Sequence, residues 1–455
     1  MIKLAQFARF NYKTLAELKA KISELKADIE LTEDISPLLK KTRIGQYELP
    51  NAMVIHPMEG CDGTDDGRPS GLTHRRYERF GAGGAGLIWF EAAAVVPEGR
   101  SNPRQLCISK DNLHSLKDLL DAALKAAEQG MGKGHRPVTI LQMTHSGRYS
   151  KPHGKAEPTF IFNDPLLDEK VGINDDCRPI TDQELDELQE RYVEAAQLAV
   201  EAGFDGIDIK ACHRYLLSEI LAGHTRAGKY GGSFENRTRF LLEVVQGIRS
   251  KVGSGPIISV RLNAHDGLPF PHGWGVEQVE GSEDIDLSEP KKLARQLYEK
   301  GVSLISVTAG NPYYKKPYIG RPFDVPVIGA DQPLEHPLES AARLMYCANE
   351  IQKGVPQAAV VGAGYSWFRQ YFANAAASQL SKGNVSLAGV GRMAFAYPDF
   401  AKDLMEKGRL EKSKVCTACS KCTQIMRDGG RTGCVIRDSE VYLPIYKEGR
   451  GLQGK

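Results

Sequence analysis

The feature of this sequence that most constrains its fold is a regular alternation of short apolar runs with segments of helical periodicity. The runs are rich in aliphatic and β-branched residues, as buried parallel strands are. They occupy residues 52–56, 86–91, 138–143, 205–210, 257–262, 303–308, 358–362 and 385–389. Segments with helical spacing lie between them, among them 111–130, 234–252, 288–300, 337–353 and 366–380. This order predicts an α/β protein built on a parallel sheet.

The clearest helical signal starts at Thr181, between the third and fourth apolar runs. The sequence TDQE at residues 181–184 is a capping box, in which a threonine and a glutamate each satisfy a free backbone N–H at the start of a helix. Apolar side chains then recur on one face until Gly203, which stops the helix.

Eight strands with helices between them fit either a closed (β/α)8 TIM barrel or an open doubly wound sheet. An open sheet would gather its polar residues at one switch point, but here they follow strand ends all along the chain. Examples are Glu59, Glu91, Gln142, Lys210, Arg261, Gly310 and Arg392. We therefore predict the barrel. The stretches 144–180, 211–233 and 310–336 show neither pattern and are expected to form long loops over its mouth.

The length divides into three expected parts. These are an N-terminal helical extension over residues 1–40, the barrel over 41–410 and a C-terminal cysteine segment over 411–455. Within the first part, residues 13–30 place Leu15, Leu18, Ile22 and Leu25 at helical spacing among charged residues. This helix either mediates a contact in a homo-oligomer or covers the barrel floor, and both alternatives stay open.

Charge and hydropathy exclude several classes of protein. Lysine and arginine number 59 against 57 aspartates and glutamates, so the net charge of +2 gives no basis for binding nucleic acid or an anionic membrane. No apolar run approaches the roughly 18–20 residues of a membrane span. The start, MIKLAQFARFNYK, lacks the apolar core of a signal peptide. We expect a cytoplasmic protein that acts on a small molecule.

Four of the nine cysteines crowd one short stretch near the end of the chain. Cys416, Cys419, Cys422 and Cys434 have the spacing C-x2-C-x2-C-x11-C, and thiolates this close together can converge on one metal centre. Zinc and an iron–sulfur cluster both accept four thiolates. Three cysteines within seven residues, followed by one distant partner, favour a [4Fe–4S] cluster. The other five cysteines are scattered and do not indicate a disulfide framework.

Glycines follow the seventh and eighth strands. Gly362 and Gly364 come after the seventh, and Gly391 and Arg392 after the eighth. In a barrel, glycines in these loops let backbone N–H groups approach a phosphate, and an arginine clamps it with two hydrogen bonds. Tight turns without a ligand fit the same glycines, so the phosphate site is one of two interpretations.

Several motifs together resemble the old yellow enzyme family of FMN-dependent oxidoreductases. The most specific is YGGS-x-x-NR-x-RF at residues 230–240, and PNAMVIHPM, GGAGLIWFEAAAVVPEGR, LQMTHSGR, IISVRL and AGVGR agree in the same order. The resemblance covers roughly residues 40–410. The four-cysteine tail resembles the iron–sulfur branch that includes 2,4-dienoyl-CoA reductase and trimethylamine dehydrogenase. It implies a TIM barrel followed by a [4Fe–4S] segment.

The resemblance implies an FMN cofactor held by residues that match the family position by position. These are Pro57 and Met58 beside the flavin ring, Ala92 where a small residue leaves room for it, Gln142 at its pyrimidine edge, Arg261 near N1 and O2, and Gly362, Gly364, Gly391 and Arg392 at the phosphate. Glu59 departs from the family, which usually has Thr, Cys or a small residue at the flavin edge. Trimethylamine dehydrogenase bonds its flavin through a cysteine at that position, whereas Cys61 comes two residues later, so we expect FMN to be bound non-covalently.

Substrate activation is implied for three residues just after the fourth strand. Lys210 and His213 would hold a carbonyl oxygen of the substrate, and Tyr215 would donate a proton. Most ene-reductases of the family have histidine where Lys210 stands. The resemblance thus favours an enzyme that reduces a C=C bond activated by a carbonyl, carboxylate or thioester. An amine dehydrogenase or N-demethylase that releases electrons through the cluster is the alternative.

The source of electrons follows from what comes after the cysteines. Large relatives continue into nucleotide-binding domains, but this chain ends 21 residues after Cys434 and has no Gly-x-Gly-x-x-Gly after a strand. We therefore expect electrons either from NAD(P)H at the flavin directly or, through the cluster, from a separate electron-transfer protein or reductase.

Overall fold

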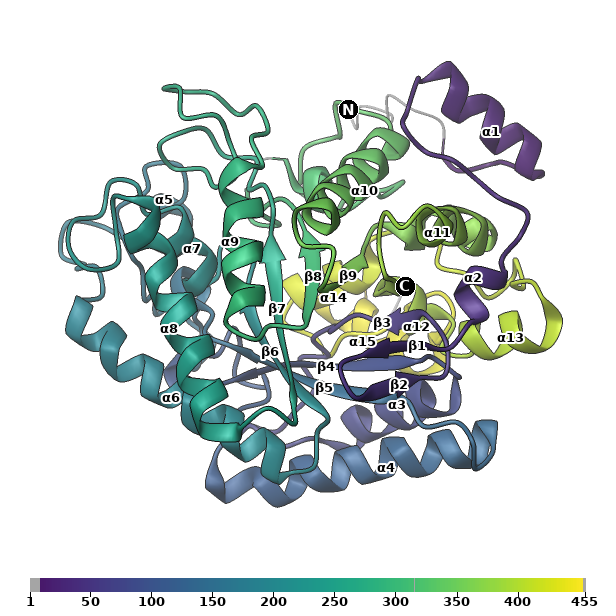
Figure 1. Cartoon of the computed structure of the whole chain (residues 1–455), viewed down its shortest axis with the longest axis horizontal. Helices are drawn as coiled ribbons and strands as arrows, with labels where there is room; N and C mark the ends of the chain where they lie inside the picture. Colours follow the sequence, from purple (N-terminus) through teal and green to yellow (C-terminus); the bar gives the residue numbers. More distant parts are fainter. Residues whose placement is uncertain (1–8, 315, 453–455) are drawn as a thin grey trace.

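A closed barrel of eight parallel strands forms the centre of the protein, in a computed structural model that describes residues 9–314 and 316–452 (Figure 1). The strands are β3 (Met53–Ile55), β4 (Leu87–Ala94), β5 (Val138–Thr144), β6 (Gly206–Ala211), β7 (Ile257–Asn263), β8 (Leu304–Thr308), β9 (Ala359–Gly362) and β10 (Leu387–Val390). Neighbours pair in chain order, and β10 closes the ring against β3, with Gly389 opposite Val54. The predicted barrel is confirmed, and the open doubly wound sheet is wrong.

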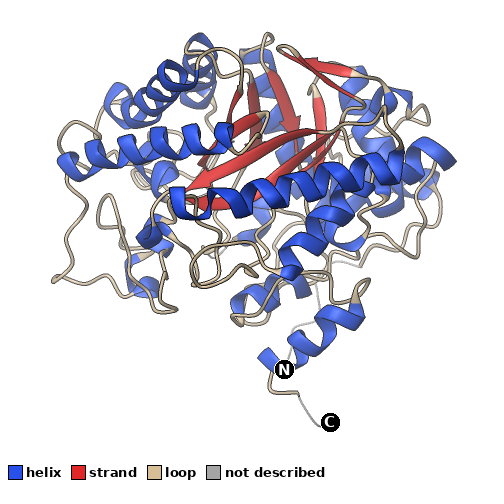
Figure 2. Cartoon of the chain, turned by 90° about the horizontal axis from the view of Figure 1, so that it is seen from below, coloured by secondary structure: helices blue, strands red, loops and turns tan. Residues whose placement is uncertain are grey.

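Helices surround the strands on the outside of the barrel, as Figure 2 shows. The longer ones are α3 (Gly71–Ala82), α4 (Leu113–Met131), α6 (Asp182–Glu201), α8 (Phe234–Val252), α9 (Ser288–Glu299), α10 (Pro337–Gly354) and α11 (Phe372–Ser381). Helix α6 begins with the predicted capping box, because Glu184 N–H donates to Thr181 Oγ1 at 3.2 Å and Thr181 N–H donates to Glu184 Oε2 at 2.8 Å. No helix within residues 9–314 and 316–452 is long and apolar enough to cross a membrane.

One helical prediction needs correction. The segment 366–380 was expected to form a single helix, but it begins as the 3₁₀ helix η5 (Tyr365–Tyr371) and becomes α11 only at Phe372. Arg369, within η5, lies at φ 52°, a left-handed value that interrupts a right-handed helix.

Shorter elements fill the loops and the ends of the chain. The helices are α1 (Leu15–Glu24), α2 (Ser36–Leu39), α5 (Asp168–Val171), α7 (Leu216–Leu221), α12 (Arg392–Ala396), α13 (Phe400–Lys407), α14 (Lys421–Arg427) and α15 (Ser439–Gly449). Further 3₁₀ turns are η1 (Pro97–Gly99), η2 (Lys110–Asn112), η3 (Gly147–Tyr149) and η4 (Pro317–Gly320). A hairpin of β1 (Thr42–Ile44) and β2 (Tyr47–Leu49) precedes the barrel.

Side chains on the two faces of each strand belong to different layers of the core. Val54 and Trp89 pack inside the barrel together with Ile44 and Leu49 of the hairpin, which closes the barrel floor. Their neighbours along the strands, such as Ile88, pack with the side chains of the outer helices. This alternation follows from the two-residue period of a strand and leaves the opposite end of the barrel for function.

The N-terminal segment lies along one side of the barrel, against η5 and α11. Leu18 and Ile22 of α1 are buried, and the ring of Phe10 packs edge-on to Trp367 with centroids 5.1 Å apart. Asn374 Nδ2 donates to the Thr32 carbonyl at 2.7 Å. The hairpin, not this helix, therefore covers the barrel floor, and a contact between copies stays a prediction.

The C-terminal segment folds back over the barrel and is drawn in yellow in Figure 1. Thr432 N–H donates to the Gly60 carbonyl at 2.6 Å. Arg75 of α3 binds both carboxylate oxygens of Asp438, at 2.7 and 2.9 Å. The segment that contains the four cysteines is thereby fixed to the β3–α3 side of the barrel. The division of the chain into three domains stays a prediction.

A buried ion cluster holds the loop between β3 and α3. Arg76 is 4% exposed and forms ion pairs with Asp62 in this loop and Glu91 in β4. Glu91 also accepts the Gly60 N–H at 2.8 Å. Burial raises the pKa of Glu91 to about 7, although the Arg76 charge acts in the opposite direction. The cluster therefore depends on Arg76, and it fixes the loop that carries Glu59.

Replacing Arg76 by methionine should leave two buried carboxyl groups without a cation. We expect R76M to lower the free energy of unfolding by about 3–5 kcal/mol, measured by urea-induced unfolding. The loss should be smaller at pH 5 than at pH 8, because protonated carboxyl groups need no counter-charge. The matched control is K117M, which breaks the exposed Lys117–Asp121 pair and should change stability by less than about 1 kcal/mol. Equal effects of the two variants would contradict a structural role for the cluster.

Candidate active site

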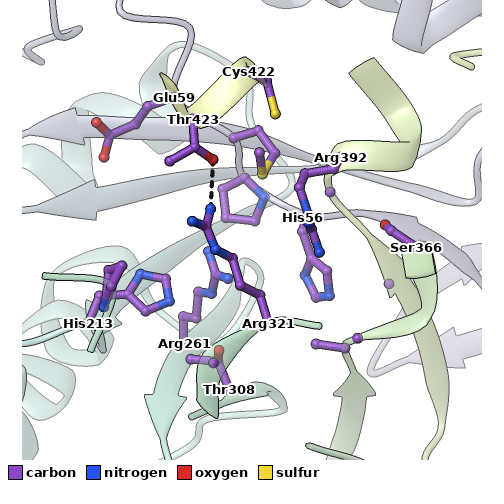
Figure 3. A pocket seen from close by; sticks show the side chains of 18 of the residues that line it. His56, Glu59, His213, Arg261, Thr308, Arg321, Ser366, Arg392, Cys422 and Thr423 are labelled. Carbon is purple, nitrogen blue, oxygen red and sulfur yellow. Dashed lines mark hydrogen bonds between the residues drawn. The ribbon is translucent and has the colours of Figure 1, made fainter. Parts of the chain in front are cut away.

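A pocket opens at the carboxyl ends of the barrel strands, where neighbouring strands bring their last side chains to one rim (Figure 3). Most of the residues singled out in the sequence line it: Pro57, Met58, Glu59, Gln142, Lys210, His213, Tyr215, Arg261, Gly364, Gly391 and Arg392. Ala92 and Gly362 are buried in β4 and β9 and are not among its lining residues. The pocket also takes in Pro312, Tyr313 and Arg321, so the predicted loop 310–336 does lie over the mouth.

Gln142 is oriented by a buried carboxylate beneath it. Its Nε2 donates to Asp208 Oδ2 at 2.6 Å, and Ser259 Oγ donates to Asp208 Oδ1 at 2.9 Å. Burial raises the pKa of Asp208 to about 6, so the group is ionised above that pH and accepts both bonds. Because Asp208 fixes the amide nitrogen through one of its N–H groups, the Gln142 oxygen is available to the pocket as a hydrogen-bond acceptor. Asp208 was not among the residues singled out in the sequence, although it shares the inward face of β6 with Lys210.

Three arginines surround the pocket without a carboxylate partner. Among residues 9–314 and 316–452, Arg261, Arg321 and Arg392 form no ion pair, and each has a guanidinium nitrogen without a hydrogen bond. Arg321 donates to Thr423 Oγ1 at 2.6 Å and Arg392 to the Pro322 carbonyl at 2.7 Å. Desolvation and the neighbouring charge of Arg392 lower the pKa of Arg321. Cations held together in this way would be stabilised by a bound anion.

Arg321 was missed in the sequence. It lies in an irregular loop after β8, where no periodicity marks which side chains face inward. The one available signal was its place directly after Gly320, which matches the Gly391–Arg392 pair that was recognised.

Glycines shape part of the pocket wall next to Met58 and His56. A Cβ on Gly391 would lie 2.7 Å from Met58 Sδ, and one on Gly389 would lie 2.1 Å from His56 Nε2. His56 Nε2 lies 3.3 Å from the Gly362 carbonyl, while its Nδ1 has no hydrogen-bond partner. Burial lowers the pKa of His56 to about 3, so the ring is neutral. These contacts leave room for a ligand only because positions 389 and 391 lack side chains.

Glu59 and Lys210 form an ion pair inside the pocket. Lys210 Nζ lies 3.1 Å from Glu59 Oε1, and the two side chains are 5% and 13% exposed. Ser101 Oγ donates to the other carboxylate oxygen of Glu59 at 3.0 Å. The Lys210 ammonium also lies 3.8 Å from the centroid of the Tyr215 ring. The carboxylate that departs from the family pattern is thus engaged by a cation of the chain itself.

Tyr215 and His213 keep their neutral forms. Burial, followed by the Glu59 charge, raises the pKa of Tyr215 well above its usual range, and its hydroxyl lies 3.1 Å from that of Tyr313. Burial and the charges of Arg261 and Lys210 lower the pKa of His213 well below its usual value. Both side chains can therefore donate a hydrogen bond at neutral pH without carrying charge.

The backbone that carries these residues is unusual. His213 and Arg214 adopt φ values of 60° and 62°, which cost energy in residues with a side chain. Buried Arg214 stabilises the turn through ion pairs of 2.9 Å with both Asp164 and Asp266. The loops from three strands therefore fix the position of His213.

The cysteine segment forms part of the same pocket, because Cys422 and Thr423 of α14 line it. Within residues 9–314 and 316–452, no three His, Cys, Asp or Glu side chains are arranged as they would be around a metal ion. The four thiols nevertheless interact. Burial raises the pKa of Cys416 to about 12, with smaller contributions from Cys422 and Cys434, and Cys419 adds to the raised pKa of Cys434.

This combination defines a (β/α)8 barrel whose pocket gathers three arginines without carboxylate partners in the described residues next to neutral hydrogen-bond donors. Residues 37–281 match the NADH:flavin oxidoreductase / NADH oxidase family. The NADPH dehydrogenase of Geobacillus sp. (strain WCH70) is 31% identical over 269 residues, 58% of this chain and 69% of the relative. The chain belongs to this family, the old yellow enzyme family.

Other relatives differ in length. The NADH oxidase of Thermoanaerobacter brockii is 29% identical over 386 residues, which are 84% of this chain but only 52% of the relative, so the chain spans about half of that protein. Among solved structures, a 2-naphthoyl-CoA reductase in complex with 2-naphthoyl-CoA superposes with a TM-score of 0.69 at 22% identity, covering 92% of this chain and 58% of that one. Morphinone reductase gives a TM-score of 0.58 at 23% identity, with 81% and 89% covered. These two likenesses confirm the fold.

The close approach of Gly389 and His56 predicts that mutations at these two positions have non-additive effects on stability. In G389A the new methyl group would overlap the buried imidazole, so we expect a loss of about 1–3 kcal/mol in unfolding free energy and a lower ratio of flavin to protein. In the H56A background the same change should cost less than 1 kcal/mol. Both quantities are measured by chemical unfolding and by absorbance of the purified protein. Equal costs in the two backgrounds would show that the overlap is not the cause.

Proposed function

We propose that the protein is an FMN- and [4Fe–4S]-dependent reductase of C=C bonds activated by a carbonyl, carboxylate or thioester group. The observation that carries the proposal is that Lys210, His213 and Tyr215 line the same pocket as Gly364, Gly389, Gly391 and three arginines that form no ion pair in the described part of the chain. FMN, when bound, supplies the hydride chemistry.

The residues of the pocket fit this cofactor. Arg321 and Arg392 would hold its phosphate, because their unpaired guanidinium groups offer charge and donors, and Gly364 and Gly391 leave their backbone open to it. The Gln142 oxygen suits a ring N–H, and Arg261 supplies positive charge to the same edge. The family relationship supports FMN and a nicotinamide nucleotide as its reductant.

On the substrate side of the pocket, the chain provides two hydrogen-bond donors and one acid that can transfer a proton to the substrate. His213, neutral, and Lys210 would donate hydrogen bonds to the oxygen of the activating group, where negative charge develops. Tyr215 retains its proton because burial and the Glu59 charge raise its pKa, and it would release that proton to the substrate carbon. Glu59 would position Lys210 by the ion pair between them.

The oxidative alternative receives less support from the same contacts. A methylated ammonium would require a free carboxylate or an electron-rich cage at the pocket. Glu59 is already paired with Lys210. Tyr318 and Phe323 pack into a buried cluster, and Tyr313, which does line the pocket, has its hydroxyl 3.1 Å from that of Tyr215. The unpaired arginines would also repel a cationic substrate.

For the cluster, the support is the chemistry and position of the donors. Four thiols lie on one short segment and influence one another electrostatically. Backbone N–H groups of Ala418 and Arg437 donate to Cys416 and Cys434 sulfur, each at 3.4 Å, as they do to cluster thiolates. Because Cys422 lines the pocket, a cluster there would adjoin the flavin and connect it to a separate electron-transfer protein or reductase.

The function is tested by the two half-reactions of Y215F. Removing the phenolic proton should slow oxidation of the reduced enzyme by enones or enoate esters about 10²–10⁴-fold. Reduction by NAD(P)H should stay within twofold, since no proton from Tyr215 is needed there. Stopped-flow absorbance of the flavin measures both rates, and Y318F serves as the control. Wild-type protein that responds to methylated amines and to no activated alkene would exclude the proposed direction.

The cluster is tested by iron content and spectroscopy. After anaerobic purification, the wild-type protein should contain about four irons and give an electron paramagnetic resonance signal on reduction. C422A should lose most of this iron and the signal. C177A removes a cysteine outside the quartet and should retain both. Zinc instead of iron in the wild-type protein would overturn the assignment.

A further inference from the structure

A second cavity adjoins the pocket on its outer side and encloses about 550 Å³. We call it the outer cavity. It shares Glu59, Tyr215, Tyr313 and Met426 with the pocket, so the two spaces meet at the residues that would activate the substrate. A ligand whose reactive bond lies beside Tyr215 would extend its remaining part into the outer cavity.

Four cations line the outer cavity: Arg104, Lys151, Lys170 and Arg427. They come from different parts of the chain, and in the stretches 9–314 and 316–452 none of them forms an ion pair. Glu59 is the one carboxylate among the described lining residues, and Lys210 and Ser101 already engage it. The outer cavity therefore has a local excess of positive charge.

This excess does not reflect a basic protein. The whole chain has a net charge of only +2, and many surface cations in the structure have acidic partners, such as Arg178 with Glu184 at 2.7 Å. Arg104 donates to the carbonyls of Cys61 and Gly429 at 3.0 and 2.5 Å, and Arg427 donates to the Pro312 carbonyl at 3.1 Å. Neutral carbonyls orient both guanidinium groups but do not neutralise them.

We propose that the outer cavity is a subsite for a phosphate-bearing part of a ligand whose reactive end lies at Tyr215 and His213. This rests on the proposed function and narrows it to substrates with a polyanionic tail. The nicotinamide dinucleotide carries the same chemistry in its pyrophosphate, so it is the second source of such a group. Several cations around one space give both charge and donors to phosphate oxygens, and the attraction is screened by salt.

The test uses two substrates with the same reactive bond: crotonyl-CoA, which carries phosphates, and the neutral crotonyl thioester of N-acetylcysteamine. The variant is K151Q/K170Q/R427Q in the holoenzyme. Arg104 is left unchanged because its two carbonyl contacts support the loop. The matched control is K133Q, an exposed lysine in the loop after α4, away from both cavities.

In the oxidative half-reaction, the triple variant should lower kcat/KM for crotonyl-CoA by at least about tenfold and that for the neutral thioester by less than twofold. Higher salt should reduce the wild-type preference for crotonyl-CoA. If the reductive half-reaction with NADH weakens instead, the bound phosphate is that of the dinucleotide. Equal changes for both thioesters with unchanged NADH kinetics would overturn the subsite.

Binding separates this inference from the proposed function. Calorimetric titration of the holoenzyme with crotonyl-CoA should give at least a tenfold weaker Kd in the triple variant, whether or not the thioester is reduced. If the wild-type protein reduces neither thioester yet binds crotonyl-CoA through these cations, the reductase proposal fails and the subsite stands. If reduction proceeds with no charge preference and no change in Kd, the subsite fails and the reductase proposal stands.

Discussion

The mouth of the barrel concentrates positive charge that the chain itself does not neutralise. Arg261, Arg321 and Arg392 come from three different loops or strands, and none meets a carboxylate in the described residues. Gathering guanidinium groups costs free energy unless an anion is present. A bound anion would therefore compensate the repulsion between these three cations and stabilise the fold. The position of the loop 310–336 depends on the same charge compensation, because the loop contributes Arg321 to the pocket.

Buried acids elsewhere in the site have separate tasks. Asp208 sits on the inner face of β6 and orients Gln142, while Glu59 pairs with Lys210 above it. Arg76 in turn holds the loop of Glu59 through Asp62 and Glu91. Each of these carboxylates is bound by a specific neighbour. The three arginines are therefore available to bind a ligand.

The barrel could be predicted because its strands are buried on both faces and read as continuous apolar runs, with polar residues just beyond each end. The same rule found Gln142, Lys210 and Arg261, and the family motifs found His213 and Tyr215. It could not find Arg321, since an irregular loop has no period that relates sequence to direction. His56 and Asp208 were not predicted for another reason: His56 directly follows β3 and Asp208 lies within β6, so an apolar run indicates that they are buried but not which groups they hydrogen-bond. Ala92 came from the family pattern, whereas Gly362 came from the glycines after the seventh strand as well as from that pattern. Both are buried in their strands and are not among the residues that line the pocket.

The C-terminal segment is joined to the site through Arg321. Its guanidinium group lies at the pocket, donates to Thr423 and so contacts the residue that follows Cys422. The Thr432 N–H bond to Gly60 ties the same segment to the loop of Glu59 on the other side. The charge of Cys422 therefore acts on Arg321, a cation that also lines the pocket, because Arg321 donates to the residue next to Cys422 and the Cys422 charge opposes the lowering of its pKa. An ordinary surface appendage would have no such connection. The charges of the cysteines and of the barrel mouth are consequently coupled, although separate features of the sequence predicted the two regions.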